Sequence, residues 1–252
     1  MSTKNLTDKV AVITGASRGL GRAIAIELGA AGAKLALVAR DRAKLEESVA
    51  ECAKEGAESA IFVTDVTDES QVATLEKDVV ARFGRVDILI NNAGVNVRKP
   101  VVEYSLDEWR KVMDTNLTSV FLLCRAFVPH MRGRGYGRIL NLTSIMSHVS
   151  LPGRGPYSAS KAGLLGLTRA LAQELAADKI TVVAISPGPF ATEMNTVLMN
   201  NPELTKLFMD NVPLNRWGKP EEVGKLARFL CSEEAGYITG TDILIDGGWT
   251  AH

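Results

Sequence analysis

The chain has 252 residues, a length that suits one large domain over residues 1–252 with a sizeable buried core. Its 29 basic and 29 acidic residues cancel and lie interspersed, so the composition favours neither nucleic acid nor a membrane surface as a partner. Three scattered cysteines form no Cys-x-x-Cys pair, and no apolar run approaches the ~18 residues of a membrane span, so we expect a soluble cytoplasmic protein without a bound metal.

Short apolar runs alternate with helical patterns along almost the whole chain. Seven of these runs are predicted to be strands, at residues 10–14, 35–39, 61–64, 88–90, 139–142, 181–185 and 243–245. The runs are apolar almost throughout, which is typical of a parallel sheet covered by helices on both faces. The pattern therefore predicts an α/β fold, a single doubly wound domain with a seven-stranded parallel sheet.

Helical patterns fill the intervals between these strands, at residues 22–31, 42–55, 70–82, 107–113, 119–131, 158–177 and 221–230. Ser105 and Glu108 have the spacing of a capping box in front of one of them. The stretch 189–220 breaks the rhythm, because it is rich in Met, Asn and Pro and longer than an ordinary connection. It follows the carboxyl end of a strand, where open α/β sheets bind ligands, so we predict a substrate lid there rather than a plain surface excursion.

A glycine-rich turn follows the first predicted strand and leads directly into a helical pattern. It reads Thr14-Gly15-Ala16-Ser17-Arg18-Gly19-Leu20-Gly21. A strand, a tight glycine turn and a helix N-terminus together offer free backbone N–H groups and a partial positive charge to a pyrophosphate. The turn therefore predicts a bound dinucleotide, and a tight turn without a ligand is the alternative.

Tyr157 and Lys161 are four residues apart in a predicted helix, so their side chains lie on one face. A lysine cation favours the phenolate and brings a tyrosine, whose pKa is ordinarily near ~10, closer to the range of acid–base catalysis. The motif alone occurs often by chance, and a solvated helix face would explain it equally well.

Taken in order, these motifs resemble the classical short-chain dehydrogenase/reductase family. The residues that carry the resemblance are the glycine turn, Asn91-Asn92-Ala93-Gly94, Asn116, Ser144, Tyr157, Lys161, Pro187-Gly188 with Thr192, and Asp246-Gly247-Gly248. The resemblance extends from Lys9 to Asp246-Gly247-Gly248 and covers essentially the whole chain. It implies a Rossmann-type NAD(P)-binding domain, an oxidoreductase acting on a ketone or secondary alcohol, and a homotetramer.

The resemblance also implies roles for four catalytic residues. Tyr157 would be the general acid for carbonyl reduction, and Lys161 would lower its pKa. Ser144 would hold the substrate oxygen, and Asn116 would hold a water against the lysine. Taken singly, a serine at a strand end and an asparagine in a helix have ordinary structural explanations.

The choice between the nicotinamide cofactors depends on the end of the second strand. Ala39 and Arg40 stand where an NAD-specific relative would have an acidic residue, and Arg40 with Arg18 suits a 2′-phosphate, so we expect NADP(H) to be preferred over NAD(H). Asp41 is the complication, since it could reach a ribose or cap the next helix. The full set implied to bind the cofactor is Gly15, Ser17, Arg18, Gly19, Leu20, Gly21, Arg40, Asp65, Val66, Asn92, Ala93, Gly94, Tyr157, Lys161, Pro187, Gly188, Phe190 and Thr192.

Three local features favour a polar and anionic small-molecule substrate. They are Asn96-Val97-Arg98-Lys99, Ser144-Ile145-Met146-Ser147, and Arg154, an arginine that suits a carboxylate. They are similar to gluconate 5-dehydrogenase-like members and suggest Ser144, Met146, Arg154 and Tyr157 as substrate contacts. Arg98 and Lys99 are equally compatible with solvated loop charges.

Other functions stay open at this point. The same basic residues would suit a 3-oxoacyl-carrier-protein or acetoacetyl-CoA reductase, and a steroid or tropinone-like ketone reductase is a further alternative. A nonenzymatic module that senses NADP(H) belongs to another class, and the intact set of Asn116, Ser144, Tyr157 and Lys161 argues against it.

Overall fold

The computed structural model describes residues 5–251, apart from the side chains of Met194, Val197, Leu204 and Leu207. Seven parallel strands form one sheet in the order β3-β2-β1-β4-β5-β6-β7. The strands are β1 (Val10–Thr14), β2 (Lys34–Ala39), β3 (Ser59–Val63), β4 (Ile88–Asn91), β5 (Gly137–Leu142), β6 (Ile180–Pro187) and β7 (Asp242–Ile245). The predicted fold class is therefore confirmed.

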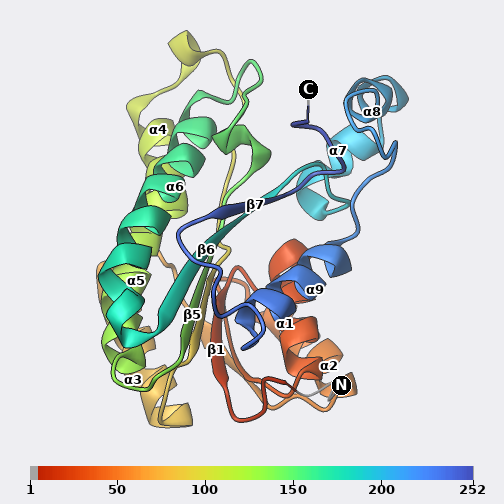
Figure 1. Cartoon of the computed structure of the whole chain (residues 1–252). Coiled ribbons are helices and arrows are strands. Elements are labelled where there is room, and N and C mark those ends of the chain that lie inside the picture. The colour runs from red at the N-terminus through yellow and green to blue at the C-terminus, as the bar shows by residue number, and fades with distance from the viewer. Residues whose placement is uncertain (1–4, 252) are drawn as a thin grey trace.

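Helices cover both faces of the sheet (Figure 1). One face carries α1 (Gly19–Ala30), α2 (Arg42–Lys54) and α9 (Pro220–Cys231), and the other carries α3 (Glu69–Phe83), α4 (Leu106–Met113), α5 (Ser119–Met131) and α6 (Gly155–Leu175). Successive residues of β1 point into different cores, because Val12 packs on the α5 side and Ile13 on the α1 side. This explains why the strands are apolar at every position.

Two helices begin three residues earlier than expected. Helix α1 begins at Gly19, within the glycine motif, and α6 begins at Gly155 with Pro156 in its first turn, a position that proline tolerates. The capping box of Ser105 and Glu108 is present at the start of α4. A π-helical turn, η2 (Asp114–Thr118), joins α4 directly to α5.

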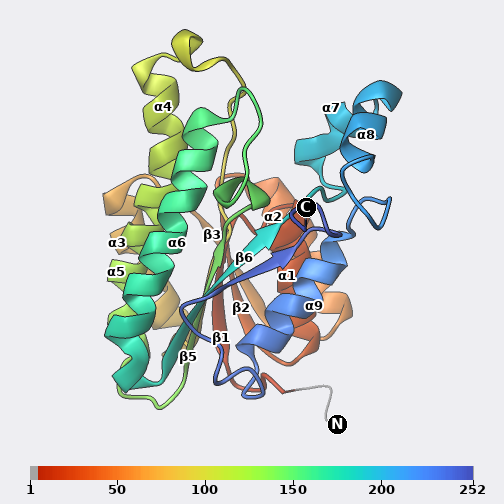
Figure 2. The ribbon, with the colours of Figure 1, turned by 45° about the horizontal axis from the view of Figure 1, so that its top comes forward.

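The carboxyl ends of the strands meet at one edge of the sheet. Strand β1 pairs with β2 on one side and β4 on the other, so the chain changes winding direction there and leaves a crevice at their carboxyl ends. Beyond this edge stand η5 (Glu193–Asn195), α7 (Thr196–Met199) and α8 (Pro202–Met209), which belong to the stretch expected to be a lid (Figure 2). The remaining short turns of 3₁₀ helix are η1 (Val101–Glu103), η3 (Ile145–Ser147) and η4 (Ala176–Asp178). Over residues 5–251, no helix combines the length and apolarity needed to cross a membrane.

Candidate active site

A cavity of about 720 Å³ opens at the carboxyl edge of the sheet, within the range of ~300–1,000 Å³ that small-molecule and cofactor sites occupy. Its wall is built from the ends of strands β1 to β6 and from the segment that follows β6. In the described part of the chain, no group of three or more His, Cys, Asp or Glu side chains is placed to hold a metal ion.

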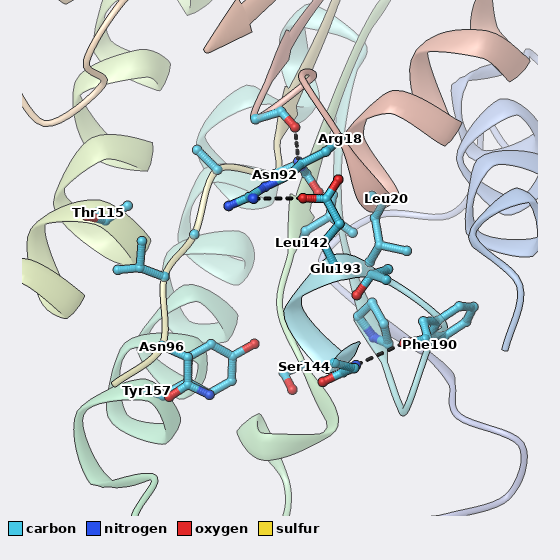
Figure 3. Close-up of a pocket in the computed structure, with 18 of the residues that line it drawn as sticks. Arg18, Leu20, Asn92, Asn96, Thr115, Leu142, Ser144, Tyr157, Phe190 and Glu193 are labelled. Carbon is cyan, nitrogen blue, oxygen red and sulfur yellow. Dashed lines mark hydrogen bonds and ion pairs between the residues drawn. The ribbon is translucent and has the colours of Figure 1, made fainter. Parts of the chain in front are cut away.

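Most of the residues expected at the site lie on this wall. They are Gly15, Ser17, Arg18, Gly19, Leu20, Arg40, Asp65, Val66, Asn92, Ala93, Gly94, Ser144, Met146, Arg154, Tyr157, Lys161, Pro187, Gly188, Phe190 and Thr192. Gly21 and Asn116 lie outside it. Figure 3 shows Arg18 beside Glu193 at one end of the cavity and labels Asn96 and Tyr157 toward the other end.

The turn after β1 is shaped to receive a phosphate group. Gly15 has a φ of +64°, and a Cβ there would lie 2.7 Å from Nδ2 of Asn92, so this position requires glycine. A Cβ on Gly21 would lie 2.3 Å from the carbonyl oxygen of Gly15, so this glycine lets α1 approach the turn closely. No side chain caps the first turn of α1, which leaves its backbone N–H groups available to an anion. The turn therefore fits the pyrophosphate of a dinucleotide.

Asn92 supports this turn from the neighbouring strand. Its Nδ2 donates to the carbonyl oxygens of Thr14 (2.9 Å) and Gly15 (3.2 Å). The backbone nitrogens of Asn92 and Ala93 donate to Oγ1 of Thr14 at 3.0 and 3.1 Å. The asparagine side chain thus fixes the two strand ends relative to each other.

Cationic side chains surround the end of the cavity near β2. Arg18 lies 2.9 Å from Glu193, and Lys44 lies 3.4 Å from the same carboxylate. Arg40 is mostly exposed and lies 3.7 Å from Asp65. Three cations and three carboxylates, Asp41 being the third, therefore line this end. The salt bridges of Glu193 and Asp65 are largely exposed to solvent and weak for that reason.

Asp41 and Asp65 both have defined local partners. Asp41 caps α2 by accepting a hydrogen bond from the backbone nitrogen of Lys44 (3.1 Å). Capping this helix was one of the two roles expected for Asp41, the other being contact with a ribose. Asp65 accepts from the backbone nitrogen and Oγ1 of Thr67. These hydrogen bonds, with the charge of Arg40, hold the pKa of Asp65 below its usual value although burial acts in the opposite direction.

Tyr157 and Lys161 lie close together at the opposite end, in the first turns of α6. Nζ of Lys161 lies 5.8 Å from the centre of the phenol ring and donates to the carbonyl oxygen of Leu142 at 2.5 Å. The lysine is 4% exposed and pairs with no carboxylate among the described residues. Burial lowers the pKa of Lys161 to about 8.

The pKa of Tyr157 is raised above its usual value, because burial outweighs the opposing effects of a hydrogen bond with Ser144 and the charges of Arg154 and Arg98. The expectation of a lowered pKa is therefore wrong in direction for the protein as it stands. Sequence spacing places a cation beside the phenol, but it carries no measure of how deeply both groups are buried.

Asn116 is fully buried in the π-helical turn η2, behind Gly94 and Lys161. Its side-chain oxygen accepts from the backbone nitrogen of Val95 (2.8 Å). Its Nδ2 donates to the carbonyl oxygen of Val95 and to Oγ of Ser160, both at 3.0 Å. Asn116 thus connects the segment after β4 to α6 next to Lys161.

Ser144 follows β5 and begins the turn η3. Its Oγ accepts a hydrogen bond from the backbone nitrogen of Met146 at 3.1 Å. The Ser144 hydroxyl also hydrogen-bonds Tyr157, so both groups face the same part of the cavity. Met146 is 7% exposed and packs against Val212 and Trp249, so it belongs both to the cavity wall and to a small apolar cluster.

Arg154 and Arg98 lie near Tyr157 on the cavity wall. Burial lowers the pKa of Arg154, and the like charge of Arg98 acts in the same direction. Within residues 5–251, neither guanidinium has an ion-pair partner. Lys99, in contrast, pairs with Glu108 and is not part of the wall, so only one of the two adjacent basic residues faces the cavity.

Sequence reasoning missed several wall residues, among them Lys44, Glu193 and Phe208, although the last two lie in the stretch expected to be a lid. Lys44 lies in the first turn of α2, four residues after Arg40, and this nearness to a predicted cofactor residue is the signal that could have found it. Phe208 comes from α8 and contacts the rings of Trp217 and Trp249, with ring centres 6.4 and 5.4 Å apart. Such contacts join segments far apart in the chain and leave no local pattern.

A doubly wound sheet with a cavity at its switch point, lined by a glycine turn, is typical of enzymes that bind a dinucleotide. Residues 15–250 match a family model described as Enoyl-(Acyl carrier protein) reductase, which is a model of short-chain dehydrogenases/reductases. The chain therefore belongs to the short-chain dehydrogenase/reductase family. It is an NAD(P)-dependent oxidoreductase that acts on alcohols or ketones.

Individual relatives carry several names. A 3-oxoacyl-[acyl-carrier-protein] reductase of Synechocystis is 39% identical over 245 residues, which cover 96% of this chain and 97% of the relative. A putative gluconate dehydrogenase of Agrobacterium tumefaciens has a TM-score of 0.95 and 38% identity over 99% of this chain and 98% of its own. A putative 2-deoxy-D-gluconate 3-dehydrogenase from the same organism, with bound NADP, has a TM-score of 0.92 and 34% identity over the full length of both chains.

Proposed function

We propose that this protein is an NADP(H)-dependent oxidoreductase of a sugar acid, interconverting a keto group and a secondary alcohol on an anionic substrate. The observation that carries the proposal is the pair of arginines, Arg98 and Arg154, on the wall beside Tyr157. Two like charges at one site repel each other, so a bound anion relieves both their repulsion and their lack of a partner. A carboxylate near the reacting carbon of the substrate would provide that anion.

The reaction needs few groups from the chain itself. Tyr157 donates the proton to the substrate oxygen during reduction, and the Ser144 hydroxyl, which hydrogen-bonds Tyr157 in this structure, donates to the same oxygen when substrate is bound. The cation of Lys161 stabilises the phenolate that remains. Asn116 hydrogen-bonds Val95 and Ser160 and so fixes the segment after β4 against the part of α6 that carries Lys161. Bound NADP(H) would supply or accept the hydride.

NADP(H) is the preferred cofactor in this proposal because of the charges near β2. Arg18, Arg40 and Lys44 could contact a 2′-phosphate with charge-assisted hydrogen bonds. Asp41 is engaged as a helix cap. The bound NADP in the structural relative from Agrobacterium tumefaciens supports the same preference.

A 3-oxoacyl-carrier-protein reductase is the second candidate, because the Synechocystis relative has that name. In that reaction the acidic carrier protein would stay outside the cavity, and only the uncharged acyl chain would reach Tyr157. The partly buried Arg154 favours the sugar acid, since an acyl chain would leave this charge without a partner inside the wall.

The segment 189–220 remains a proposed lid, supported by the wall residues Phe190, Thr192 and Phe208 that it contributes. A homotetramer also remains a proposal. Phe121 on α5 is 48% exposed, which is compatible with a subunit contact on that helix. Light scattering would report the oligomeric state.

The test compares Arg154→Gln with the wild type on 5-ketogluconate, acetoacetyl-CoA and an uncharged ketone, each with NADPH. We expect KM for the sugar acid to rise about 10- to 100-fold, the effect of losing a charge-assisted hydrogen bond of ~1.5–3 kcal/mol, with little change for the uncharged ketone. Arg169→Gln, at an exposed position on the same helix, is the matched control. Wild-type activity confined to acyl thioesters, or an unchanged KM for the sugar acid, would refute the proposal.

A further inference from the structure

The segment 143–148, which carries Ser144 and the turn η3, is tied at both ends to one carboxylate. Asp242, at the start of β7, accepts a hydrogen bond from Oγ of Ser186 (2.7 Å) on Oδ2. Ring nitrogen Nε2 of His148 contacts the same oxygen. The Thr143 hydroxyl lies 3.3 Å from the other oxygen of Asp242.

These contacts reach Ser144 through its own backbone. Oγ of Ser186, which is fully buried, lies 3.0 Å from the carbonyl oxygen of Ser144 and 2.9 Å from Oγ1 of Thr143. The backbone nitrogen of Thr143 donates to the carbonyl oxygen of Ile185. The N-terminal end of the segment is thus fixed to β6, and His148 fixes its C-terminal end to β7.

The buried position of Asp242 makes this arrangement strong. Its side chain is 8% exposed, whereas that of His148 is 34% exposed. A carboxylate withdrawn from water needs hydrogen-bond donors, and such charge-assisted hydrogen bonds are roughly twice as strong as neutral ones. Because Oδ2 is held by Ser186 of β6 and by His148, displacing His148 leaves the buried carboxylate short of a partner.

We propose that His148 and Asp242 are positioning residues that hold the hydroxyl of Ser144 in place for the reaction. The inference rests on the proposed role of Ser144 as a donor to the substrate oxygen. The turn η3 between the two anchors supplies the Met146 nitrogen that orients Oγ of Ser144, so movement of His148 shifts the direction of that hydroxyl. Errors of about 1 Å in such a position reduce turnover by up to ~100-fold.

The experiment is a double-mutant cycle between residues 148 and 144, measured at saturating NADPH on a ketone substrate that the wild type reduces. We expect His148→Ala to lower kcat about tenfold while the Kd for NADPH, followed by fluorescence, changes less than twofold. His148→Gln keeps an N–H donor for Asp242 and should recover most of the loss. In a Ser144→Ala background, the change at residue 148 should alter kcat by less than twofold.

His130→Ala is the matched control, because His130 makes a similar contact with Glu76 between α5 and α3, away from the cavity. It should leave kcat unchanged. The inference is overturned if His148→Ala keeps kcat within twofold of the wild type, if its loss persists undiminished in the Ser144→Ala background, or if His130→Ala is equally impaired. Asp242→Asn, which keeps the shape but removes the charge, should reproduce the loss. Full activity of Ser144→Ala alone would instead refute the proposed role of Ser144.

Discussion

Lys161→Met is expected to make the folded protein more stable at pH 7 while removing its activity. Burial lowers the pKa of Lys161 from 10.5 to about 8, and a difference of about 2.5 between the unfolded and folded pKa values opposes folding by ~3.4 kcal/mol. Methionine fills a similar space without a charge but loses the hydrogen bond to Leu142, which contributes about 1 kcal/mol. The net gain is ~2 kcal/mol, or roughly 4–8 °C in Tm for a chain of this length.

The pH dependence identifies the cause of the gain. The pKa of Lys161 is lower in the folded state, so between about pH 8 and pH 10.5 the lysine is protonated in the unfolded chain and largely neutral in the folded one. The free energy of unfolding of the wild type therefore rises with pH across that window. The advantage of the variant is therefore complete below pH 8 and disappears by about pH 10.

The assay is urea unfolding of both proteins at equal concentration, at pH 7 and at pH 10. Lys77→Met, at an exposed position on α3, is the control and should change the free energy of unfolding by less than ~0.5 kcal/mol at either pH. A variant less stable than the wild type at pH 7, or one whose advantage is the same at both pH values, would refute the reasoning.

Two further substitutions test the cofactor end of the cavity. Gly21→Ala places a Cβ 2.3 Å from the carbonyl oxygen of Gly15, so we expect unfolding to become easier by ~1–3 kcal/mol and NADPH binding to weaken more than tenfold by calorimetry. Gly166→Ala, whose Cβ would meet no atom within 4 Å, should do neither. Arg40→Ser should weaken NADPH binding about tenfold, the loss of one charge-assisted contact, and leave NADH binding unchanged. Exposed Arg42→Ser is its control, and equal losses for both cofactors would contradict a 2′-phosphate role.

The strands and the glycine turn were predictable because their signals are local. A parallel sheet buried on both faces requires apolar runs, and the turn after β1 requires glycine where a Cβ would collide with Asn92. Helix α1 starts three residues before its predicted start, because the apolar periodicity of that helix becomes clear only after the glycine motif. Local patterns thus predicted the elements and their order better than their exact ends.

Contacts between distant segments account for what the sequence could not predict. The π-helical turn η2 holds Asn116 against Val95 and Ser160, 21 and 44 residues away, and no pattern around residue 116 signals it. Lys44 meets Glu193 across 149 residues. The pKa of Tyr157 depends on burial by the whole fold, so a neighbouring lysine at the right spacing indicated the chemistry but not the direction of the shift.

The charge balance of the cavity links its stability to its function. The chain as a whole is neutral, yet Lys161, Arg154 and Arg98 gather near Tyr157 without acidic partners among the described residues. Lys161 is buried and Arg154 is half-buried, whereas Arg98 is exposed. An unpaired cation withdrawn from water opposes folding, and the proposed anionic substrate would offset that cost for Arg154. The same excess of positive charge stabilises a phenolate at Tyr157. In the proposed function, the same cations would attract an anionic substrate and favour the phenolate of Tyr157, so one electrostatic arrangement would serve both roles.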